Sequence, residues 1–350
     1  MYNIHLLPAL FGDAILIEYG TPKEPHYILI DGGPYYGYEK MIAGLKKVAP
    51  KMKEIELLII THIDIDHIDG IVTFLNSSPL PYKVKEVWFN GFEQLNKKDI
   101  MESLLGVLQG EYLSHLIIKN KLSHNSVFSG NAIAVRDTAQ LPQITLAGGF
   151  EITLLAPSVK ALRELCLDWK KELKKINEKG TIEKQLKNDT RYDEPVSLPA
   201  NILGGGADKS VANNSSIAFI GKYKDKSCLF AGDSPSAALL SGIKLLKSQS
   251  DKLKLDAWKL AHHGSKRSTD KSIINEIKAK HILVSTNGDR YHLPHEECIR
   301  SVIEGNAPCN IYFNYTSEYN SLWRTEEIQE EMKFKSHYPT TTDSGISVEL

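Results

Sequence analysis

A run of ten residues rich in histidine and aspartate constrains this chain more than any other feature. It extends from Thr61 to Gly70 and directly follows an apolar, strand-like segment at residues 55–60. Four potential metal ligands occupy six consecutive positions within it: His62, Asp64, Asp66 and His67. Carboxylates and imidazoles this close together need a cation to organise them, and such donors suit a divalent ion such as zinc or manganese. The run therefore predicts a metal site at a strand end rather than a solvated acidic turn.

Length, composition and charge are those of an ordinary folded protein. The 350 residues are 42% hydrophobic and 24% charged, which suits one elaborated domain or about two domains. A net charge of -1 argues against a protein that coats nucleic acid non-specifically. No apolar run is long enough to span a bilayer, and the N-terminus lacks the features of a secretory signal. Four widely spaced cysteines favour buried thiols in a reducing compartment, so we expect a cytoplasmic protein.

Apolar segments separated by turns predict strands along most of the chain. The expected strands are 13–19, 27–31, 55–60, 86–89, 216–220, 228–231, 257–260, 281–284 and 345–350. Most are continuously apolar, which predicts burial on both faces. Helices are expected at 38–48, from about Asp69, and at 159–176, where apolar residues recur every three or four positions. We interpret residues 1–350 as a single domain with insertions at about 92–145 and 158–212. Within the second, the polar stretch 177–212 is expected to be a mobile loop or lid.

Two further segments place ligand-type residues directly after an apolar strand. Residues 228–231 lead into Gly232-Asp233, and residues 257–261 lead into His262-His263-Gly264-Ser265. A single Gly-Asp at a strand end is more often a turn. Three such segments together favour one pocket on which they converge.

In this order, the motifs resemble the metallo-β-lactamase superfamily. The superfamily motifs are Leu29-Ile30-Asp31-Gly32-Gly33, His62-x-Asp64-x-Asp66-His67 and Gly232-Asp233. Four further segments are similar to the branch typified by the soluble hydrolase domain of ComEC-type DNA-uptake proteins: Gly12-Asp13-Ala14-Ile15-Leu16-Ile17, Asn213-Asn214-Ser215-Ser216, His262-His263-Gly264-Ser265 and Gly345-x-Ile-x-Val. The resemblance implies an α/β (α+β) fold, the αββα sandwich. Two packed mixed β-sheets would carry outer helices and a binuclear metal site at one edge.

The resemblance also implies which residues bind two divalent metal ions, Zn2+ or Mn2+. His62 and Asp64 would bind the first ion, and Asp66 and His67 would bind the second. Asp233 would bridge the two ions.

The pair His262-His263 would complete the second site. We favour His263 because it precedes the glycine, and His262 is the other candidate. The usual third ligand of the first ion is a histidine that falls near Asn213-Asn214-Ser215, with Asn214 as our candidate neighbour of the ligands. An amide is a poorer ligand than imidazole, and Asp64 also replaces a usual histidine. We therefore expect a weaker, more oxygen-rich first site at which manganese competes with zinc.

The expected chemistry follows from the two cations. A water that bridges them would lose a proton near neutral pH and act as the hydroxide nucleophile. Asp66 is the candidate to orient that water as well as to bind metal. Asp13 and Asp31 are candidates to hold the ligand histidines in the correct tautomer, and turn carboxylates are the alternative.

A late segment, residues 287–295, resembles the branch's Tyr-Gly-His-Pro-His segment. Pro294 and His295 match it, whereas Leu293 replaces its first histidine. His295 is thus the first candidate proton donor and His292 the second, with a structural role at a helix start as the alternative.

Ser265 and Lys266 follow the ligand histidines, which makes them candidates to contact a substrate phosphate. These features favour a metal-dependent hydrolase, most of all a phosphodiesterase or nuclease acting on nucleic acid or a nucleotide. The near-zero net charge and the absence of an aromatic–basic repeat weigh against a processive nuclease. The alternatives are a small-molecule esterase, thioesterase or lactamase of the same fold, or a catalytically silent interaction module. The sequence identifies no protein partner.

Overall fold

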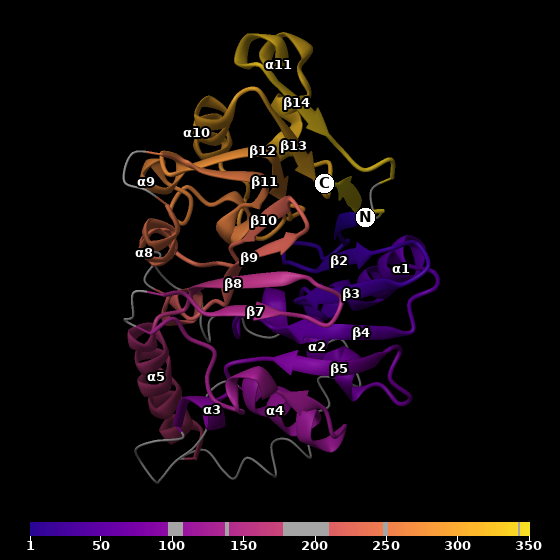
Figure 1. Cartoon of the computed structure of the whole chain (residues 1–350), viewed down its shortest axis with the longest axis vertical. Helices are drawn as coiled ribbons and strands as arrows, with labels where there is room; N and C mark the ends of the chain where they lie inside the picture. The colour runs from indigo at the N-terminus through magenta and orange to yellow at the C-terminus, as the bar shows by residue number, and fades with distance from the viewer. Residues whose placement is uncertain (97–107, 137–139, 178–209, 248–250, 342–343) are drawn as a thin grey trace.

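Two mixed β-sheets pack against each other, and helices cover the outer face of each (Figure 1). This computed structural model describes residues 1–96, 108–136, 140–177, 210–247, 251–341 and 344–350. The strand order is β15-β1-β2-β3-β4-β5-β6 in the first sheet and β14-β13-β12-β11-β10-β9-β8-β7 in the second. The predicted αββα sandwich is therefore confirmed.

The first sheet is built mainly from the first ninety residues. Its strands are β1 (Tyr2–Leu6), β2 (Ile15–Gly20), β3 (Pro25–Ile30), β4 (Glu54–Ile59), β5 (Lys83–Trp88), β6 (Ser123–His124) and β15 (Ile346–Glu349). Strands β15, β1, β2 and β3 are antiparallel neighbours, whereas β3 to β6 run parallel. The predicted C-terminal strand is β15, and its pairing with β1 brings the two chain ends close together (Figure 1).

The second sheet contains the parallel strands that lead into the second and third ligand segments. Its members are β7 (Gln143–Thr145), β8 (Glu151–Ala156), β9 (Ala218–Tyr223), β10 (Lys226–Phe230), β11 (Leu253–Lys259), β12 (Ile277–Val284), β13 (Cys309–Phe313) and β14 (Phe334–His337). Strands β10 to β14 run parallel to one another. Strand β7 lies within the predicted first insertion and adds an edge strand to this sheet. Residues 92–145 therefore contribute to the sheet as well as to loops and helices.

The helices lie outside the two sheets. They are α1 (Tyr38–Val48), α2 (Ile65–Asn76), α3 (Phe92–Asn96), α4 (Leu108–Lys119), α5 (Val159–Asn177), α7 (Val211–Asn214), α8 (Ser236–Leu246), α9 (Lys271–Ile274), α10 (Glu296–Asn306) and α11 (Glu326–Met332), with 3-10 turns η1 (Tyr35–Gly37), η2 (Ser126–Phe128), η4 (Ala261–Gly264) and η5 (Glu318–Arg324). Helix α1 has the predicted bounds, and α5 extends one residue beyond its prediction. The prediction that a helix starts near Asp69 was wrong, because α2 begins at Ile65, directly after the extended residue Asp64.

Alternating side chains along each central strand explain the layered core. On β3, Ile28 and Ile30 pack between the sheets, whereas Leu29 belongs to the cluster beneath the outer helices. A third cluster fills the space between the second sheet and its helices. Burial on both faces accounts for the continuous apolar strands seen in the sequence.

The remaining sequence predictions concern the polar loop, the number of domains, the cysteines and membrane-spanning segments. Most of the predicted polar loop at 177–212, with its three consecutive glycines, lies outside the described residues, and the single-domain organisation stays a prediction. All four cysteines are free, as expected; Cys228, Cys298 and Cys309 are buried, but Cys166 is only half-buried. Among the described helices, none combines the length and apolar character needed to cross a bilayer.

Candidate metal centre

The loops that carry the predicted ligands meet at one end of the two sheets. Asp31 follows β3, and the His62 loop follows β4, the parallel neighbour of β3. Asp233 follows β10, and His262-His263 follows β11, which is parallel to β10. Carboxyl ends of adjacent parallel strands share an edge, where binding sites are commonly built.

Close backbone packing holds the first ligand run in place. The N–H of Gly32 donates to the carbonyl of His67 at 2.9 Å, and the N–H of Gly70 donates to that of Gly33 at 2.8 Å. A Cβ atom at Gly70 would lie 2.0 Å from the carbonyl oxygen of Gly32, so only glycine fits there. The first turn of α2 is thereby pressed onto the loop after β3, and this contact fixes the position of His67.

An unusual backbone turn presents the histidine pair. His262 and His263 have φ angles of 48° and 55°, and Gly264 follows with a φ of 86°. The left-handed conformation costs a non-glycine residue of order 1–3 kcal/mol and persists only where surrounding contacts impose it. Here His262 N–H donates to the carbonyl of Gly232 at 3.0 Å, and Ser265 N–H donates to that of His262 at 2.9 Å. The turn brings both imidazoles to the same carboxylate.

Asp233 is the point on which the four histidines converge. Its Oδ1 lies 3.3 Å from Nε2 of His67. Its Oδ2 lies 3.9 Å from Nε2 of His62, 3.8 Å from that of His262 and 3.9 Å from that of His263. The structure therefore brings together residues that are some 200 positions apart in the sequence.

Two further carboxylates complete the cluster. Asp64 Oδ2 lies 3.6 Å from Nε2 of His62, and its side chain is half-buried. Asp66 Oδ2 lies 3.4 Å from Nε2 of His263, and Asp66 is buried. All seven residues predicted as ligands thus lie in one cluster of contacts.

The donor set fits divalent metal ions. The buried Nε2 atoms of His62, His67 and His263 and Oδ1 of Asp233 have no hydrogen-bond partner within the described part of the chain. Bonds of about 2.0–2.2 Å place neighbouring ligands of a tetrahedral ion roughly 3.3–3.5 Å apart, close to the separations in this cluster. Ligand atoms of His62, His67 and Asp233, and those of Asp66, His67 and His263, lie within 4.8 Å of one another. Buried nitrogen and oxygen atoms left without partners are what a metal site requires.

Hydrogen bonds on the outer nitrogens prepare two of the imidazoles as ligands. Nδ1 of His67 lies 2.8 Å from Asp31 Oδ2, which also accepts from the Thr61 hydroxyl at 2.7 Å. Because that hydroxyl donates to Asp31, its oxygen accepts the Nδ1 proton of His62, 3.0 Å away. We assign this tautomer from the hydrogen-bond network; in the neutral ring it leaves each Nε2 atom, which faces Asp233, available to bind metal.

His263 has a different set of outer partners. Its Nδ1 lies 2.9 Å from the carbonyl oxygen of Ser285 and 3.3 Å from Asp13 Oδ1. The other oxygen of Asp13 accepts from Nζ of Lys259 at 2.5 Å, and that lysine side chain is only 1% exposed. A buried ion pair therefore stands directly behind His263.

The electrostatics of the cluster favour cations. Burial alone would lower the pKa of His263, but Asp13 and Asp233 raise it to about 10. Burial alone would raise the pKa of Asp233, but His67, His262 and His263 hold it well below its usual range. Nearby carboxylates also raise the pKa of His67 well above its usual value, so the metal-free cluster holds protons on His67 and His263 that divalent ions would displace.

The prediction for Asn214 requires a correction. Its side-chain nitrogen donates to the carbonyl of Ser210 at 3.3 Å. The preceding residue, Asn213, is buried instead, and its Nδ2 lies 3.3 Å from Nδ1 of His262. Both lie in the single turn α7, where successive side chains point in directions about 100° apart. No signal in the sequence distinguishes these two identical residues.

Lys259, Thr61 and Ser285 also support the site, and the sequence analysis assigned them no role. Lys259 could have been noticed as the lysine within the otherwise apolar predicted strand 257–260, which leads into a ligand pair. The contribution of Ser285 is made by its backbone carbonyl, which any residue could supply.

The four candidates for proton donation and phosphate binding have different surroundings in the structure. Nδ1 of His295 accepts from the Lys266 N–H at 3.2 Å, whereas His292 is exposed, with its ring 5.0 Å from that of Tyr319. The Lys266 side chain forms an ion pair with Glu297 at 2.9 Å. The hydroxyl of Ser265 accepts a weak hydrogen bond, 3.4 Å long, from the backbone N–H of Arg267. The phosphate-binding roles of Ser265 and Lys266 stay predictions.

Comparison with known proteins locates the similarity in the first sheet. The model of the metallo-beta-lactamase superfamily matches residues 7–96, which include β2 to β5 and the run 61–70. No curated protein sequence matches the chain. The resemblance to ComEC-type domains stays a prediction.

Several solved structures are similar at low sequence identity. A CmlA beta-hydroxylase E377D mutant is 13% identical with a TM-score of 0.44, and the match covers 100% of this chain and 54% of that one. Zn(2+)-bound PqqB from Methylobacterium extorquens is 11% identical with a TM-score of 0.44, covering 99% and 100%. A diphosphatase from the PhnP family is 12% identical with a TM-score of 0.41, covering 100% and 98%.

Proposed function

We propose that this chain is a metal-dependent phosphodiesterase whose two divalent ions are held around Asp233. One observation carries the proposal: four imidazole Nε2 atoms approach that carboxylate within 3.3–3.9 Å, and three of these atoms are buried without a hydrogen-bond partner in the described chain. The metallo-beta-lactamase match over residues 7–96 supports the broader assignment to metal-dependent hydrolases.

Each ion would have its own set of ligands in addition to Asp233. His62, Asp64 and His262 would hold the first, since Asn213 offers an amide where an imidazole is usual. Asp66, His67 and His263 would hold the second. When bound, the two ions supply a water of lowered pKa as nucleophile and stabilise negative charge on the substrate oxygens.

The charge of the ligand set favours a phosphodiester over a neutral amide or ester. Asp64, Asp66 and Asp233 offset three of the four positive charges of two divalent ions. While the bound water is still neutral, one positive charge then remains in a largely buried site, where it attracts a phosphodiester monoanion. Three carboxylates also make the site oxygen-rich, which supports competition of manganese with zinc.

His295 is suited to protonate the leaving group. Its Nδ1 accepts the Lys266 N–H, so the neutral ring carries its proton on Nε2. Burial, followed by the charge of Lys266, lowers the pKa of His295. The ring can protonate the leaving group only after Nδ1 has taken a second proton from solvent and lost the Lys266 hydrogen bond, and the lowered pKa then makes it the stronger acid. Its backbone N–H donates to the carbonyl of Gly264, next to His263, and this holds it beside the ligands.

The proposal is tested with methyl p-nitrophenyl phosphate as a simple phosphodiester. We expect hydrolysis by the protein loaded with Zn2+ or Mn2+, and loss of that activity with chelator and in the Asp66→Ala and Asp233→Ala variants. Asp225→Ala, in the turn between β9 and β10, is the matched control and should keep full activity.

Two other outcomes would support the alternatives instead. Turnover of nitrocefin or a thioester without phosphodiesterase activity would favour the esterase, thioesterase or lactamase. A metal-loaded protein that leaves all these compounds intact would favour a catalytically silent interaction module.

A further inference from the structure

A second group of side chains meets beside the metal centre: Phe11, Arg290 and Tyr291. The guanidinium carbon of Arg290 lies 5.2 Å from the ring centre of Phe11 and 5.3 Å from that of Tyr291. The two ring centres are 6.3 Å apart and the ring planes stand at 87°. The arginine therefore occupies the angle between two aromatic rings that come from opposite ends of the chain.

The backbone around this group is attached to the metal-ligand loops. A Cβ atom at Gly12, next to Phe11, would lie 1.8 Å from the carbonyl oxygen of Asp66, so the two segments are in direct contact. The loop that carries Arg290 joins the same place, because Asn287 N–H donates to the carbonyl of Leu10 at 2.8 Å. The three side chains thus stand at the border of the site and not on a remote surface.

The electrostatics of Tyr291 agree with this location. Burial raises its pKa to about 12, with a further contribution from the carboxylate of Asp66 and smaller ones from Asp64 and Asp233. Arg290 acts in the opposite direction. Tyr291 nevertheless remains 43% exposed, so part of the residue is open to a ligand.

Arg290 is a cation whose hydrogen-bond donors are available. No hydrogen bond or ion pair joins it to another residue in the described part of the chain. Its acidic neighbour Asp289 is exposed and accepts from the Asn287 amide at 2.5 Å. Lys266, by contrast, is already paired with Glu297. A guanidinium held against aromatic rings keeps its N–H groups directed along its plane, a geometry suited to two phosphate oxygens.

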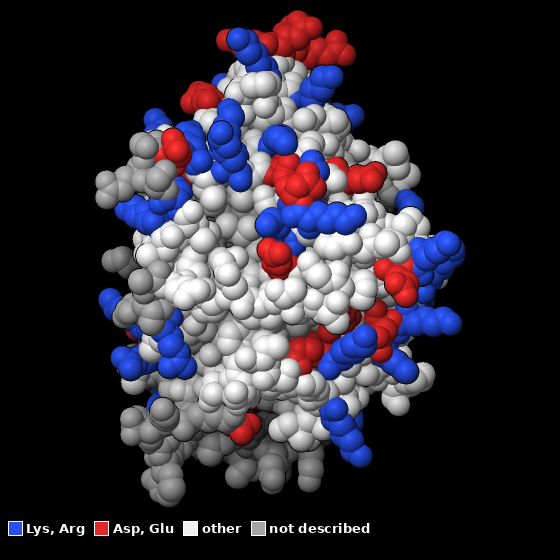
Figure 2. All heavy atoms as spheres, viewed as in Figure 1, with Lys and Arg blue, Asp and Glu red and all other residues white. Residues whose placement is uncertain are grey.

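We propose that these three residues form a nucleotide clamp. Arg290 binds the non-bridging oxygens of the phosphodiester, Tyr291 stacks on the adjoining base, and Phe11 holds the arginine from the other side. This rests on the proposed function and specifies its substrate class: a phosphodiester that carries an unpaired nucleobase. The face shown in Figure 2 has Lys and Arg interspersed with Asp and Glu, and the net charge of the whole chain is -1. A long duplex would need a broad basic surface, so a short substrate suits this charge balance better.

Two esters with the same p-nitrophenolate leaving group test the clamp: the p-nitrophenyl ester of thymidine 5′-monophosphate, and methyl p-nitrophenyl phosphate, which lacks a base. Wild type should prefer the thymidine ester. Tyr291→Ala should lower kcat/KM for that ester about tenfold and leave the methyl ester unchanged, because stacking on one base is lost. Tyr291→Phe should keep the preference, and Arg290→Met should lower kcat/KM for both esters.

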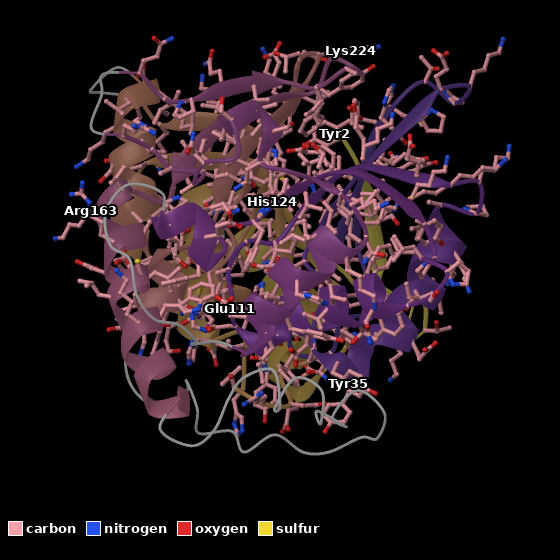
Figure 3. All side chains as sticks on the ribbon, turned by 90° about the horizontal axis from the view of Figure 1, so that it is seen from below. Tyr2, Tyr35, Glu111, His124, Arg163 and Lys224 are labelled. Atoms are coloured by element: carbon pink, nitrogen blue, oxygen red, sulfur yellow. The ribbon has the colours of Figure 1, made fainter. Side chains whose placement is uncertain are left out.

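Lys224→Met is the matched control. This lysine also lies over an aromatic ring, that of Tyr223 at 5.5 Å. Figure 3 shows Lys224 at the edge of the molecule opposite Tyr35, which belongs to the turn η1 that follows the Asp31 loop. Replacement of Lys224 should change neither rate.

The outcomes separate the clamp from the proposed function. Equal losses on both esters in Tyr291→Ala, or no loss, would overturn the stacking role, and an unaffected Arg290→Met would overturn the phosphate role. If wild type hydrolyses neither ester, the proposed function fails. Calorimetric titration of the metal-loaded protein with thymidine 5′-monophosphate then tests the clamp alone. Binding weakened in Arg290→Met supports it, and absent or equal binding refutes it.

Discussion

Replacing Asp31 with asparagine should weaken metal binding while leaving the protein folded. Asp31 is fully buried and accepts three hydrogen bonds: from the Thr61 N–H at 2.8 Å, from the Thr61 hydroxyl at 2.7 Å and from Nδ1 of His67 at 2.8 Å. Its φ of 56° is left-handed, a conformation that asparagine tolerates as well as aspartate does. The substitution therefore changes the hydrogen bonding and not the backbone.

The size of the effect on metal affinity and stability depends on which carboxylate oxygen of Asp31 is replaced by an NH2 group. The amide oxygen can still accept the Thr61 N–H, but the NH2 group then faces Nδ1 of His67 and the Thr61 hydroxyl. To avoid opposing donors, His67 must move its proton to Nε2, the atom that faces Asp233. Loss of such an outer partner lowers metal affinity roughly 10–100-fold, which corresponds to about 1.4–2.8 kcal/mol. A mismatched buried donor should cost about 1–3 kcal/mol of stability, less than the total for a typical domain.

Two measurements check this prediction. Competition titrations of chelator-stripped protein with Zn2+ and Mn2+ give the metal affinity, and urea unfolding without metal gives the stability. Asp225→Asn serves as an exposed control. If Asp31→Asn binds both metals as tightly as wild type but unfolds more easily, Asp31 is a structural residue and the tautomer argument is refuted.

Three further predictions concern the residues around the centre. Lys259→Met should lower the free energy of unfolding of the metal-free protein by about 3–5 kcal/mol, because it removes the lysine that pairs with the buried Asp13 and leaves only His263 beside that carboxylate; urea unfolding should show part of that loss restored in the Lys259→Met/Asp13→Asn double variant, and a loss well under 1 kcal/mol would contradict the pairing. Asn213→Ala should weaken metal binding at the first site and Asn214→Ala should not, as measured by metal stoichiometry after dialysis; equal effects would argue against the buried position of Asn213. The folded-state pKa of His263, about 10, exceeds its ordinary 6.5, so its contribution to metal-free stability is fully present below about pH 6.5 and is lost as pH rises toward 10. Metal competes with that proton, so calorimetric titrations from pH 6 to pH 9 should show tighter binding as pH rises, with proton release on binding throughout, and a pH-independent affinity would count against the cluster.

Local patterns in the sequence located the strands and the first ligand run, and the resemblance of the motifs to a known superfamily supplied the fold class and the remaining proposed ligands. His62, Asp64, Asp66 and His67 lie within six residues after an apolar strand, so their proximity needs no tertiary information. Strand positions could also be predicted, because burial on both faces imposes continuous apolar segments. The start of α2 could not, since the charged residues of its first turn serve the site and conceal the helical pattern.

Tertiary structure decided how distant residues meet and which atoms they present. The left-handed turn at His262 and His263 aims both rings at one carboxylate, and no residue pattern encodes those dihedral angles. The choice of Asn213 over Asn214 depends on the direction of one helical turn. Arg290 reaches Phe11 only because the two ends of the chain are joined through the packed sheets. A sequence lists side chains in order along the chain, whereas the chemistry of a site depends on distances and directions that packing alone determines.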